Sequence, residues 1–291
     1  MKYLTLAEIL QPCMGQGWAV GAYDTCNLEI TQAIVEAAAA DQAPVIIMIY
    51  PNHTPQAEWP TLLRIIDAEV ERMHIPAALV LDHAKTLDQI EYALKLGFSG
   101  VMIDASLAPL EQNIALTRRA VDLAHVKGAS VEAELGHVGV GQDIVNEDQQ
   151  LESLTRVDEA ELFVNETGVD ALAVSIGTLH GLYKGKPHLD FERLTQLRAA
   201  CQIPLVLHGG SDTPDQDLRR AIEMGIAKIN IWTDVRIPFL RALRDALDGP
   251  IEKTEVHVAF AAARAAAIEV IRKKNLLLGS TGKTSHYIKS S

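Results

Sequence analysis

The sequence is poor in cysteine, and its few cysteines form no recognisable pattern. Cys13, Cys26 and Cys201 are odd in number and widely spaced, with no CxxC pair among them. This usage excludes a disulfide-stapled scaffold and a cysteine-rich zinc module, and it is typical of a protein from a reducing compartment. We therefore expect a cytoplasmic location.

Long hydrophobic runs are also missing. The longest, APVIIMIY, is far shorter than the roughly 20 residues that a helix needs to cross a bilayer. The first residues, MKYLTLAEIL, are typical of the start of an amphipathic helix and lack the apolar core of a signal peptide. We therefore expect no membrane partner.

Basic residues are the minority among the charged ones. The chain has 26 Lys and Arg against 38 Asp and Glu, which gives a formal net charge of −12. A negative net charge disfavours non-specific binding to nucleic acid and to anionic membranes. It does not exclude an anionic small molecule, because local charge and backbone N–H groups decide binding inside a site.

What the sequence does contain is a regular alternation of short apolar runs with longer helical patterns. Near-continuous apolar runs are typical of parallel strands that are buried on both faces. The predicted strands span 19–24, 43–50, 77–83, 100–106, 130–136, 171–177, 204–210 and 226–233. The predicted helices span 29–40, 55–74, 86–96, 109–127, 158–167, 190–200, 214–224 and 234–247. This alternation predicts an α/β fold, the (β/α)8 TIM barrel, over an open doubly wound sheet.

No linker rich in proline, glycine or serine divides the 291 residues, so a single domain over 1–291 is predicted. Residues 137–157 form a long polar loop after the fifth strand, which we interpret as an active-site lid. Residues 253–275 predict an additional C-terminal helix, which covers the barrel or packs against another subunit. The tail 279–291 is expected to be mobile.

Three of the ten histidines, His83, His180 and His208, fall at the ends of the third, sixth and seventh predicted strands. Barrels of this kind carry their active sites at the carboxyl ends of the strands. A lone histidine is more often structural, but three at one barrel mouth are a less common coincidence. Three imidazoles with an open position are typical of catalytic zinc.

Asp82 directly precedes the first of these histidines and is the candidate general acid or base. The alternative is a carboxylate that orients a neighbouring imidazole or caps the next helix. Adjacent strand residues point to opposite faces, so Asp82 and His83 share the mouth only where the strand ends. Further polar candidates for substrate contact at the strand ends are Asp24, Asn27, Ser106, Asn230 and Thr233.

The sequence HGGS, which holds Gly209, Gly210 and Ser211, ends the seventh strand just before a helix. Backbone N–H groups in such a turn bind anions, and phosphate sites of barrels often lie after the seventh and eighth strands. Gly181 lies in a similar turn, with Lys184 nearby. An ordinary tight turn is the alternative interpretation of both segments.

With these residues in view, the chain resembles the class II ketose-bisphosphate aldolases, especially those for tagatose and fructose 1,6-bisphosphate. The resemblance covers nearly the whole chain. Its carriers are LDHAKTLDQIEYALKLGFSGVMIDAS, SVEAELG, ALAVSIGTLHGLYKGKPHLDF, PLVLHGGSDTPD and KINIWTD. The family implies a zinc-dependent retro-aldol cleavage through an enediolate.

The resemblance also implies roles for single residues. His83, His180 and His208 would bind Zn²⁺, Asp82 would be the acid/base, and Glu134 would be an acidic residue of the metal site. The positions that match those holding dihydroxyacetone phosphate are Gly181, Gly209, Ser211, Asn230 and Thr233. A Na⁺ or K⁺ ion near the phosphate and a homodimer or homotetramer are further implications of the resemblance.

Several positions around the substrate depart from the family pattern. The loop after the fifth strand has Gln142 before Asp143 where relatives carry a Glu-Asp pair. Tagatose-type relatives have a histidine where this chain has Ala84. Positions that are small in many relatives, and that we take as candidates for altered specificity, are Tyr50, Asn52, His53, Leu179 and Trp232.

Two substrate hypotheses follow from this pattern. In the first, a phosphorylated or otherwise anionic ketose gives dihydroxyacetone phosphate and an aldehyde. In the second, Leu179 and Trp232 shrink the phosphate pocket, and a ketose with a free C1 hydroxyl, such as sulfofructose, gives dihydroxyacetone. Trp232 either points into the mouth or turns outward against a helix.

Two further hypotheses replace zinc-dependent cleavage by another role or another mechanism. A non-catalytic partner subunit of an aldolase is one, against which the intact Asp82 and histidine set argue. A Schiff-base aldolase that uses Lys228 on the eighth strand is the other, for which a buried structural lysine is the simpler explanation.

Overall fold

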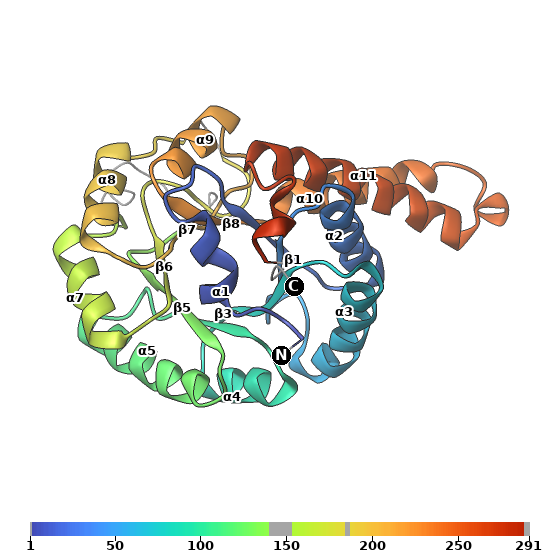
Figure 1. Ribbon diagram of the computed structural model, residues 1–291. Coiled ribbons are helices and arrows are strands. Elements are labelled where there is room, and N and C mark those ends of the chain that lie inside the picture. The colour runs from blue at the N-terminus through green and yellow to red at the C-terminus, as the bar shows by residue number, and fades with distance from the viewer. Residues whose placement is uncertain (1, 140–152, 184–186, 288–291) are drawn as a thin grey trace.

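The computed structural model describes residues 2–139, 153–183 and 187–287 and contains a closed parallel barrel (Figure 1). Each strand pairs with its neighbour in chain order, and the eighth pairs with the first. The strands are β1 (Val20–Asp24), β2 (Val45–Ile49), β3 (Ala77–Ala84), β4 (Gly100–Ile103), β5 (Ser130–Leu135), β6 (Ala171–Val174), β7 (Leu205–Leu207) and β8 (Ile226–Ile231). The predicted TIM barrel is confirmed.

Helices surround the barrel and bury the outer faces of the strands. They are α2 (Leu28–Ala40), α3 (Trp59–Met73), α4 (Leu87–Leu96), α5 (Leu110–His125), α7 (Val157–Thr167), α8 (Phe191–Ala200), α9 (Asp215–Glu223) and α10 (Thr233–Ala246). Helix α4 illustrates how local residues set the two ends of a helix. The Thr86 side chain accepts a hydrogen bond from the Gln89 N–H at its start, and Gly97 ends it in the left-handed conformation.

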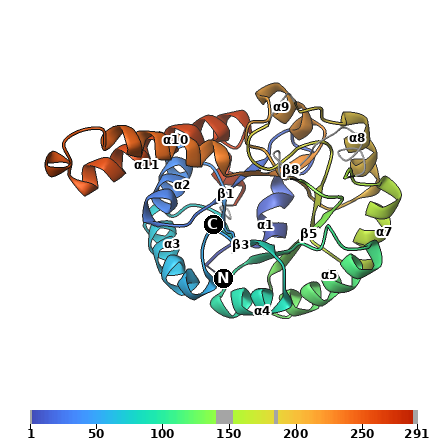
Figure 2. The same ribbon diagram turned by 180° about the vertical axis from the view of Figure 1, so that it is seen from behind.

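A short helix, α1 (Leu6–Leu10), closes the amino end of the barrel and lies at the centre of the ring in both views (Figures 1 and 2). Thr5 and Glu8 cap its first turn reciprocally. Leu6, Ile9 and Leu10 are fully buried in one apolar cluster with the inward-facing side chains of the strands. The opposite, carboxyl end of the strands is therefore the end at which a cavity opens.

The additional C-terminal helix is confirmed as α11 (Val256–Leu277), which packs on α10 and α2 and extends outward from the barrel (Figure 1). Its buried residues, Ala259, Ala263, Ala267 and Ile271, recur every four positions. The expectation of a mobile tail is wrong as far as Tyr287, whose hydroxyl donates to the Ile9 carbonyl at 2.6 Å. None of the described helices is long and apolar enough to cross a membrane.

The strand ends differ from the predicted ones, most clearly at β8. The sequence places Trp232 and Thr233 on this strand, but β8 ends at Ile231 and Thr233 is the first residue of α10. The cause is local, because the Ser211 hydroxyl accepts hydrogen bonds from the N–H groups of Trp232 and Asp234 at 3.2 Å. This contact satisfies two donors at the helix start.

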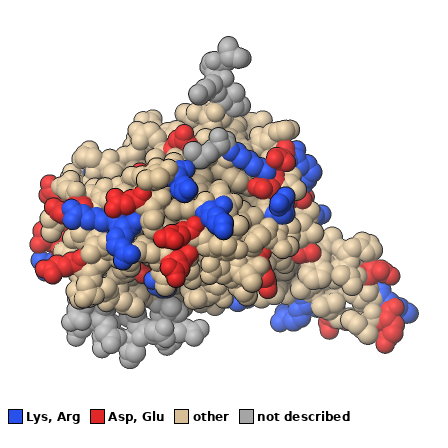
Figure 3. Space-filling model, turned by 90° about the horizontal axis from the view of Figure 1, so that it is seen from below, with Lys and Arg blue, Asp and Glu red and all other residues tan. Residues whose placement is uncertain are grey.

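The surface carries charges of both signs. On the face in Figure 3, the basic and acidic side chains of the described residues are interspersed over the barrel and at the end of the α10–α11 projection. The net charge of −12 therefore does not come from a single acidic patch on this face.

Candidate active site

A cavity of about 580 Å³ opens at the carboxyl ends of the strands. Its lining includes most of the residues predicted from the sequence. These are Asp24, Tyr50, His53, Asp82, His83, Glu134, His180, Gly181, Gly209, Ser211, Asn230, Trp232 and Thr233. Residues that are far apart in the sequence thus share one wall, as the barrel topology requires.

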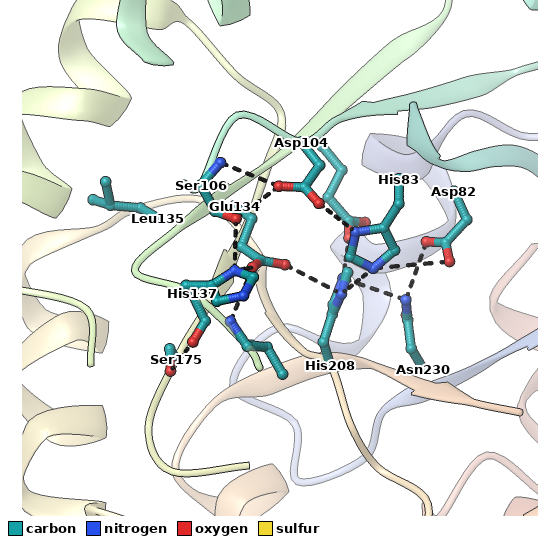
Figure 4. Close-up of polar contacts among 12 residues, drawn as sticks. Asp82, His83, Asp104, Ser106, Glu134, Leu135, His137, Ser175, His208 and Asn230 are labelled. Carbon is teal, nitrogen blue, oxygen red and sulfur yellow. Dashed lines mark hydrogen bonds and ion pairs between the residues drawn. The ribbon is translucent and has the colours of Figure 1, made fainter. Parts of the chain in front are cut away.

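Four possible metal ligands converge at the base of this cavity. His83, Glu134, His180 and His208 each offer one ligand atom, and these atoms all lie within 4.8 Å of one another. They come from β3, β5 and the segments after β6 and β7. Figure 4 shows three of them, with the His83 and His208 rings next to each other at a steep angle and the Glu134 carboxylate directed toward His208.

Both Asp82 and His83 reach the mouth, although β3 continues to Ala84. The sequence alone allowed this only at a strand end. The structure achieves it differently, because His83 has a left-handed backbone with φ of 47° and the β3–β4 register shifts between Leu81 and Ala84. Such an irregularity redirects a side chain within a strand.

The His83 ring is oriented by a carboxylate on the neighbouring strand. Its Nδ1 lies 2.9 Å from Asp104 Oδ2, which also accepts a bond from Lys85 Nζ at 2.5 Å, while Ser106 donates to Oδ1. Burial would raise the pKa of Asp104, but the hydrogen bonds from His83, Lys85 and Ser106 hold it well below its usual range. An ionised Asp104 therefore accepts the Nδ1 proton, and Nε2 faces the cluster.

His208 has the same kind of support from a different pair. Its Nε2 lies 2.8 Å from Glu132 Oε1, and Glu132 Oε2 lies 2.7 Å from Lys228 Nζ. All three side chains are fully buried. The Nδ1 atom of His208 therefore faces inward, 3.0 Å from His83 Nε2 and 3.5 Å from Glu134 Oε2.

This donor set fits a divalent cation such as zinc. The two facing imidazole nitrogens lie 3.0 Å apart, and each ring has its other nitrogen held by a carboxylate. Glu134 Oε2 is buried and has no hydrogen-bond partner among the described residues. Inward-directed lone pairs with an orphaned carboxylate oxygen are stabilised by a shared cation.

The electrostatics of the metal-free cluster agree with this interpretation. Burial lowers the pKa of His83, but Asp82, Asp104 and Glu134 outweigh this effect and raise the pKa to about 9. Burial and the neighbouring His83 lower the pKa of His180 to about 4. The carboxylates around the cluster therefore favour a positive charge at His83.

Asp82 lies beside the cluster, with Oδ2 4.0 Å from His83 Nε2. Its Oδ1 accepts a hydrogen bond from Asn230 Nδ2 at 3.3 Å, so that one face of the carboxylate is fixed. Asp24 at the end of β1 is also buried, and burial together with the Asp82 charge raises the pKa of Asp24 well above its usual value. Asp24 therefore holds a proton more readily than an exposed aspartate does.

The glycine-rich turn after β7 lies against the turn after β6. Gly209 has φ of 68°, and a Cβ there would overlap the Leu179 carbonyl group. The Gly210 N–H donates to the Asn230 carbonyl at 3.0 Å, so this amide is used inside the fold and is not directed at an anion. Gly209, Ser211 and Gly181 line the cavity.

A row of aromatic rings forms another wall. The Trp232 ring lies 5.0 Å from the His53 ring, His53 lies 4.7 Å from Tyr50, and Tyr50 lies 5.9 Å from His83, all between centroids. Of the two predicted orientations of Trp232, the structure therefore has the one directed into the mouth. Arg236 lines the cavity beside this row.

Some predicted contacts do not line the cavity. Asn27 caps α2 by accepting the Ile30 N–H, Ser106 contacts Asp104 and His137, and Asn52 donates to the Tyr50 hydroxyl at 2.7 Å. Leu179 contributes its backbone, whose N–H donates to the Tyr183 hydroxyl. The positions of Lys184, Gln142 and Asp143 lie outside the described residues, as does most of the predicted lid.

Sequence reasoning gave no role to several residues that shape the site. Asp104 and Glu132 support metal-site histidines, Lys85 pairs with Asp104, and Arg236 is a cation at the mouth. Lys228, which the sequence suggested only as a Schiff-base or a structural lysine, pairs with Glu132. A signal for the carboxylates was present, since Asp104 lies near the end of a predicted strand and Glu132 is a charged residue within an otherwise largely apolar one. Nothing in the strand pattern indicated Arg236, which lies within a helix.

Comparisons with known proteins agree with this geometry. Residues 4–283 match the family described as class-II fructose-bisphosphate aldolase. A fructose-bisphosphate aldolase of Staphylococcus aureus is 37% identical over 286 residues, which cover 97% of this chain and 99% of that protein. The crystal structure of the YdjI aldolase from Escherichia coli K12 superposes with a TM-score of 0.84 at 30% identity, over 97% of this chain and 99% of that one. The fructose-bisphosphate aldolase of Campylobacter jejuni shares the fold, with a TM-score of 0.81 at 22% identity, over 97% of each chain.

Proposed function

Because the chain belongs to the class II fructose-bisphosphate aldolase family and is a carbon–carbon lyase, we propose that it cleaves a phosphorylated ketose reversibly into dihydroxyacetone phosphate and an aldehyde. The observation that carries this proposal is the convergence of four possible metal ligands beside Asp82 in one cavity. Neither a binding module nor a non-catalytic subunit needs such a set.

His83, His180, His208 and Glu134 are the residues that would hold the zinc ion that class II aldolases use. A zinc ion supplies Lewis-acid polarisation of the ketose carbonyl, which makes the electrons of the breaking bond easier to accept. The orphaned oxygen of Glu134 and the two facing imidazole nitrogens support this assignment.

Asp82 takes the proton from the C4 hydroxyl as the C3–C4 bond breaks. The C4 oxygen then forms the aldehyde carbonyl, and the bond electrons pass to the three-carbon fragment as an enediolate, which is later protonated at C3. Asn230 holds Oδ1 of Asp82 and leaves Oδ2 directed at the cluster. A fixed carboxylate acts as a general base more efficiently than a rotating one.

Gly181, Gly209, Ser211 and Thr233 form the proposed cradle for the C1 phosphate. They lie on the segments after β6, β7 and β8, next to the amino end of α10. Backbone N–H groups and the helix dipole at such an end favour an anion. The Na⁺ or K⁺ ion near the phosphate and the homo-oligomer stay predictions.

One observation favours a second candidate, a ketose with a free C1 hydroxyl. The Trp232 indole lines the cavity next to Thr233, where it occupies volume and offers no positive charge. The Schiff-base alternative loses its support, because Lys228 is fully buried, paired with Glu132 and absent from the residues that line the cavity.

The decisive experiment is a cleavage assay with fructose and tagatose 1,6-bisphosphates on the purified protein, after chelation and after zinc is restored. We expect activity only with zinc, and none in His208→Ala, which loses one of the ligands. Full activity together with stoichiometric zinc in His208→Ala would overturn the assignment.

A parallel assay compares dihydroxyacetone with its phosphate as aldol donors, in the wild type and in Trp232→Ala. We expect the phosphate to be preferred in both, because the Trp232 ring contacts His53 on the β2 side and the cradle lies on the β6–β8 side. A preference for unphosphorylated dihydroxyacetone that Trp232→Ala reverses would establish the second candidate.

A further inference from the structure

Two of the proposed metal ligands are each backed by a carboxylate and a lysine. His83 Nδ1 lies 2.9 Å from Asp104 Oδ2, and Lys85 Nζ lies 2.5 Å from the same oxygen. His208 Nε2 lies 2.8 Å from Glu132 Oε1, and Lys228 Nζ lies 2.7 Å from Glu132 Oε2. The two chains of contacts share no residue.

The two lysines differ in their surroundings. The Lys85 side chain is 55% exposed, and Asp104 also accepts hydrogen bonds from the Ser106 N–H and hydroxyl groups. The Lys228 side chain is 0% exposed, and no donor other than Lys228 and His208 is within hydrogen-bond distance of Glu132 in the described part of the chain. Water can replace Lys85 as a donor, but it cannot reach Lys228.

The donors and acceptors of Lys228, Glu132 and His208 allow only one direction for the hydrogen bonds between them. An ammonium group only donates, so Glu132 Oε2 accepts from Lys228. Glu132 Oε1 then remains as the acceptor for the proton on His208 Nε2. Asn230 Nδ2 lies 3.3 Å from the same nitrogen, but an amide NH₂ donates and cannot take up that proton.

We propose that Lys228, acting through Glu132, is a positioning residue that fixes His208 in the tautomer with Nε2 protonated and Nδ1 open toward the metal ion. This inference rests on the proposed zinc site. Lys228 does not reach the substrate and takes no part in covalent chemistry. It sets in advance which imidazole nitrogen carries a lone pair, so that zinc binding needs no rearrangement of the ring.

An isosteric substitution isolates this effect from packing. In Glu132→Gln, Lys228 donates to the new amide oxygen, and the amide nitrogen then faces His208 Nε2 as a donor. His208 must accept with Nε2 and carry its proton on Nδ1, which removes the lone pair that faces the cluster. Lys228→Met removes the donor itself and leaves the buried carboxylate without its ammonium partner.

The first measurement is the tautomer of His208 in the zinc-free protein, read from ¹⁵N chemical shifts of labelled histidine and assigned with His208→Ala. We expect Nε2–H in the wild type and Nδ1–H in Glu132→Gln. Because this readout needs neither metal nor activity, it separates the present inference from the proposed function.

The second measurement is zinc affinity by chelator competition. Supporting residues behind a ligand typically account for about 10- to 100-fold in metal affinity. We expect a loss of this size in Glu132→Gln and Lys228→Met. The control is Lys273→Met, which breaks the exposed Lys273–Glu269 ion pair of 2.6 Å on α11 and should stay within about threefold of the wild type.

The outcomes are distinct. A shifted tautomer together with weaker zinc binding in Glu132→Gln supports the proposal, and a weaker zinc affinity in Lys228→Met adds to it. An unchanged Nε2–H tautomer overturns it, even if zinc binding weakens, because the residue then has only a structural role. If Lys228→Met does not fold, Glu132→Gln decides alone. Failure of the wild type to bind zinc would instead refute the proposed function.

Discussion

At the scale of single residues, the Asp82 carboxylate has two different sides. Asn230 fixes Oδ1, whereas Oδ2 faces the cluster and the cavity. Because removal of a positioned general base slows turnover by roughly 100- to 10,000-fold, we expect Asp82→Ala to lower kcat by that factor and to keep its zinc. Steady-state kinetics and metal analysis of the same preparation check this.

A control experiment separates the proton transfer by Asp82 from the chemistry of the metal ion. Exchange of the C3 proton of dihydroxyacetone phosphate with solvent does not need the C4 proton transfer, so it should survive better in Asp82→Ala than cleavage does. Cleavage at the wild-type rate in Asp82→Ala would contradict the role given to this carboxylate.

The raised pKa of His83 leads to a prediction of how zinc affinity depends on pH. Its pKa is raised from 6.5 to about 9 in the metal-free protein, so zinc must displace one proton at neutral pH. We expect the apparent affinity to rise about tenfold per pH unit up to about pH 9 and then to level off. His180, with a pKa lowered to about 4, contributes nothing in this window.

Chelator competition between pH 6 and pH 9.5 measures this dependence. His83→Ala lacks one of the proposed ligands and is expected to bind zinc weakly, so the control is proton release, measured by calorimetry in buffers of different ionisation enthalpy. A flat profile with no proton released would show that His83 is already neutral in the metal-free protein.

Part of the site could be predicted at this scale. The positions of His83, His180 and His208 followed from their place at strand ends, because the topology of a barrel brings all such ends together. The contacts of Asp104 and Glu132 could not be derived, since they depend on the register between strands and on which ring nitrogen faces inward.

At the scale of elements, the turn after β7 holds His208 against the turn after β6. Gly209→Ala would place a Cβ into the Leu179 carbonyl group, on top of the strain of a left-handed alanine. We expect a loss of about 2–4 kcal/mol in the free energy of unfolding, together with weaker zinc binding. Denaturant unfolding of the metal-free protein measures the first effect.

Gly15→Ala is the matched control. Gly15 has φ of 67°, close to the 68° of Gly209, but a Cβ there would meet nothing within 4 Å. It should cost only about 1 kcal/mol, the strain of the left-handed backbone alone. Equal losses in the two variants would show that the Leu179 contact does not constrain the turn.

Strand ends were the least predictable part of the elements. The apolar run through Trp232 continues the pattern of β8, and nothing in its composition marks the change to helix at Thr233. The change depends on Ser211, which lies about twenty positions earlier and accepts the N–H groups of Trp232 and Asp234. Periodicity within one segment cannot reveal a cap that comes from another segment.

At the scale of the whole molecule, the barrel distributes function over its circumference. The proposed phosphate cradle lies on the β6–β8 side, and the proposed metal ligands lie on β3 and β5 and after β6 and β7. The row of Trp232, His53 and Tyr50 lies between β8 and β2. A ketose bound as proposed would therefore extend across the cluster toward this row. The eight alternating strand and helix patterns were enough to predict the order of the strands, because each strand of such a parallel barrel lies between its neighbours in the sequence.

Arg236 is the candidate contact for the distal end of the proposed substrate. It lies on α10 one turn after Trp232, lines the cavity and makes no ion pair with any described residue. An unpaired cation beside an aromatic wall favours an anionic group, and a hydrogen bond to a charged group contributes about 1.5–3 kcal/mol. We expect Arg236→Gln to raise KM for a 1,6-bisphosphate about 10- to 100-fold with little change in kcat.

The comparison that decides the role of Arg236 uses two substrates and two variants. A ketose 1-phosphate lacks the distal anion, so its KM should not respond to Arg236→Gln. Arg241→Gln, an exposed arginine on the same helix, should leave both substrates unaffected and controls for net charge. If Arg236→Gln raises KM equally for both substrates, Arg236 acts on the C1 phosphate instead. If it changes neither, the distal group is held without it, and the neutral donors of Tyr50 and His53 suffice.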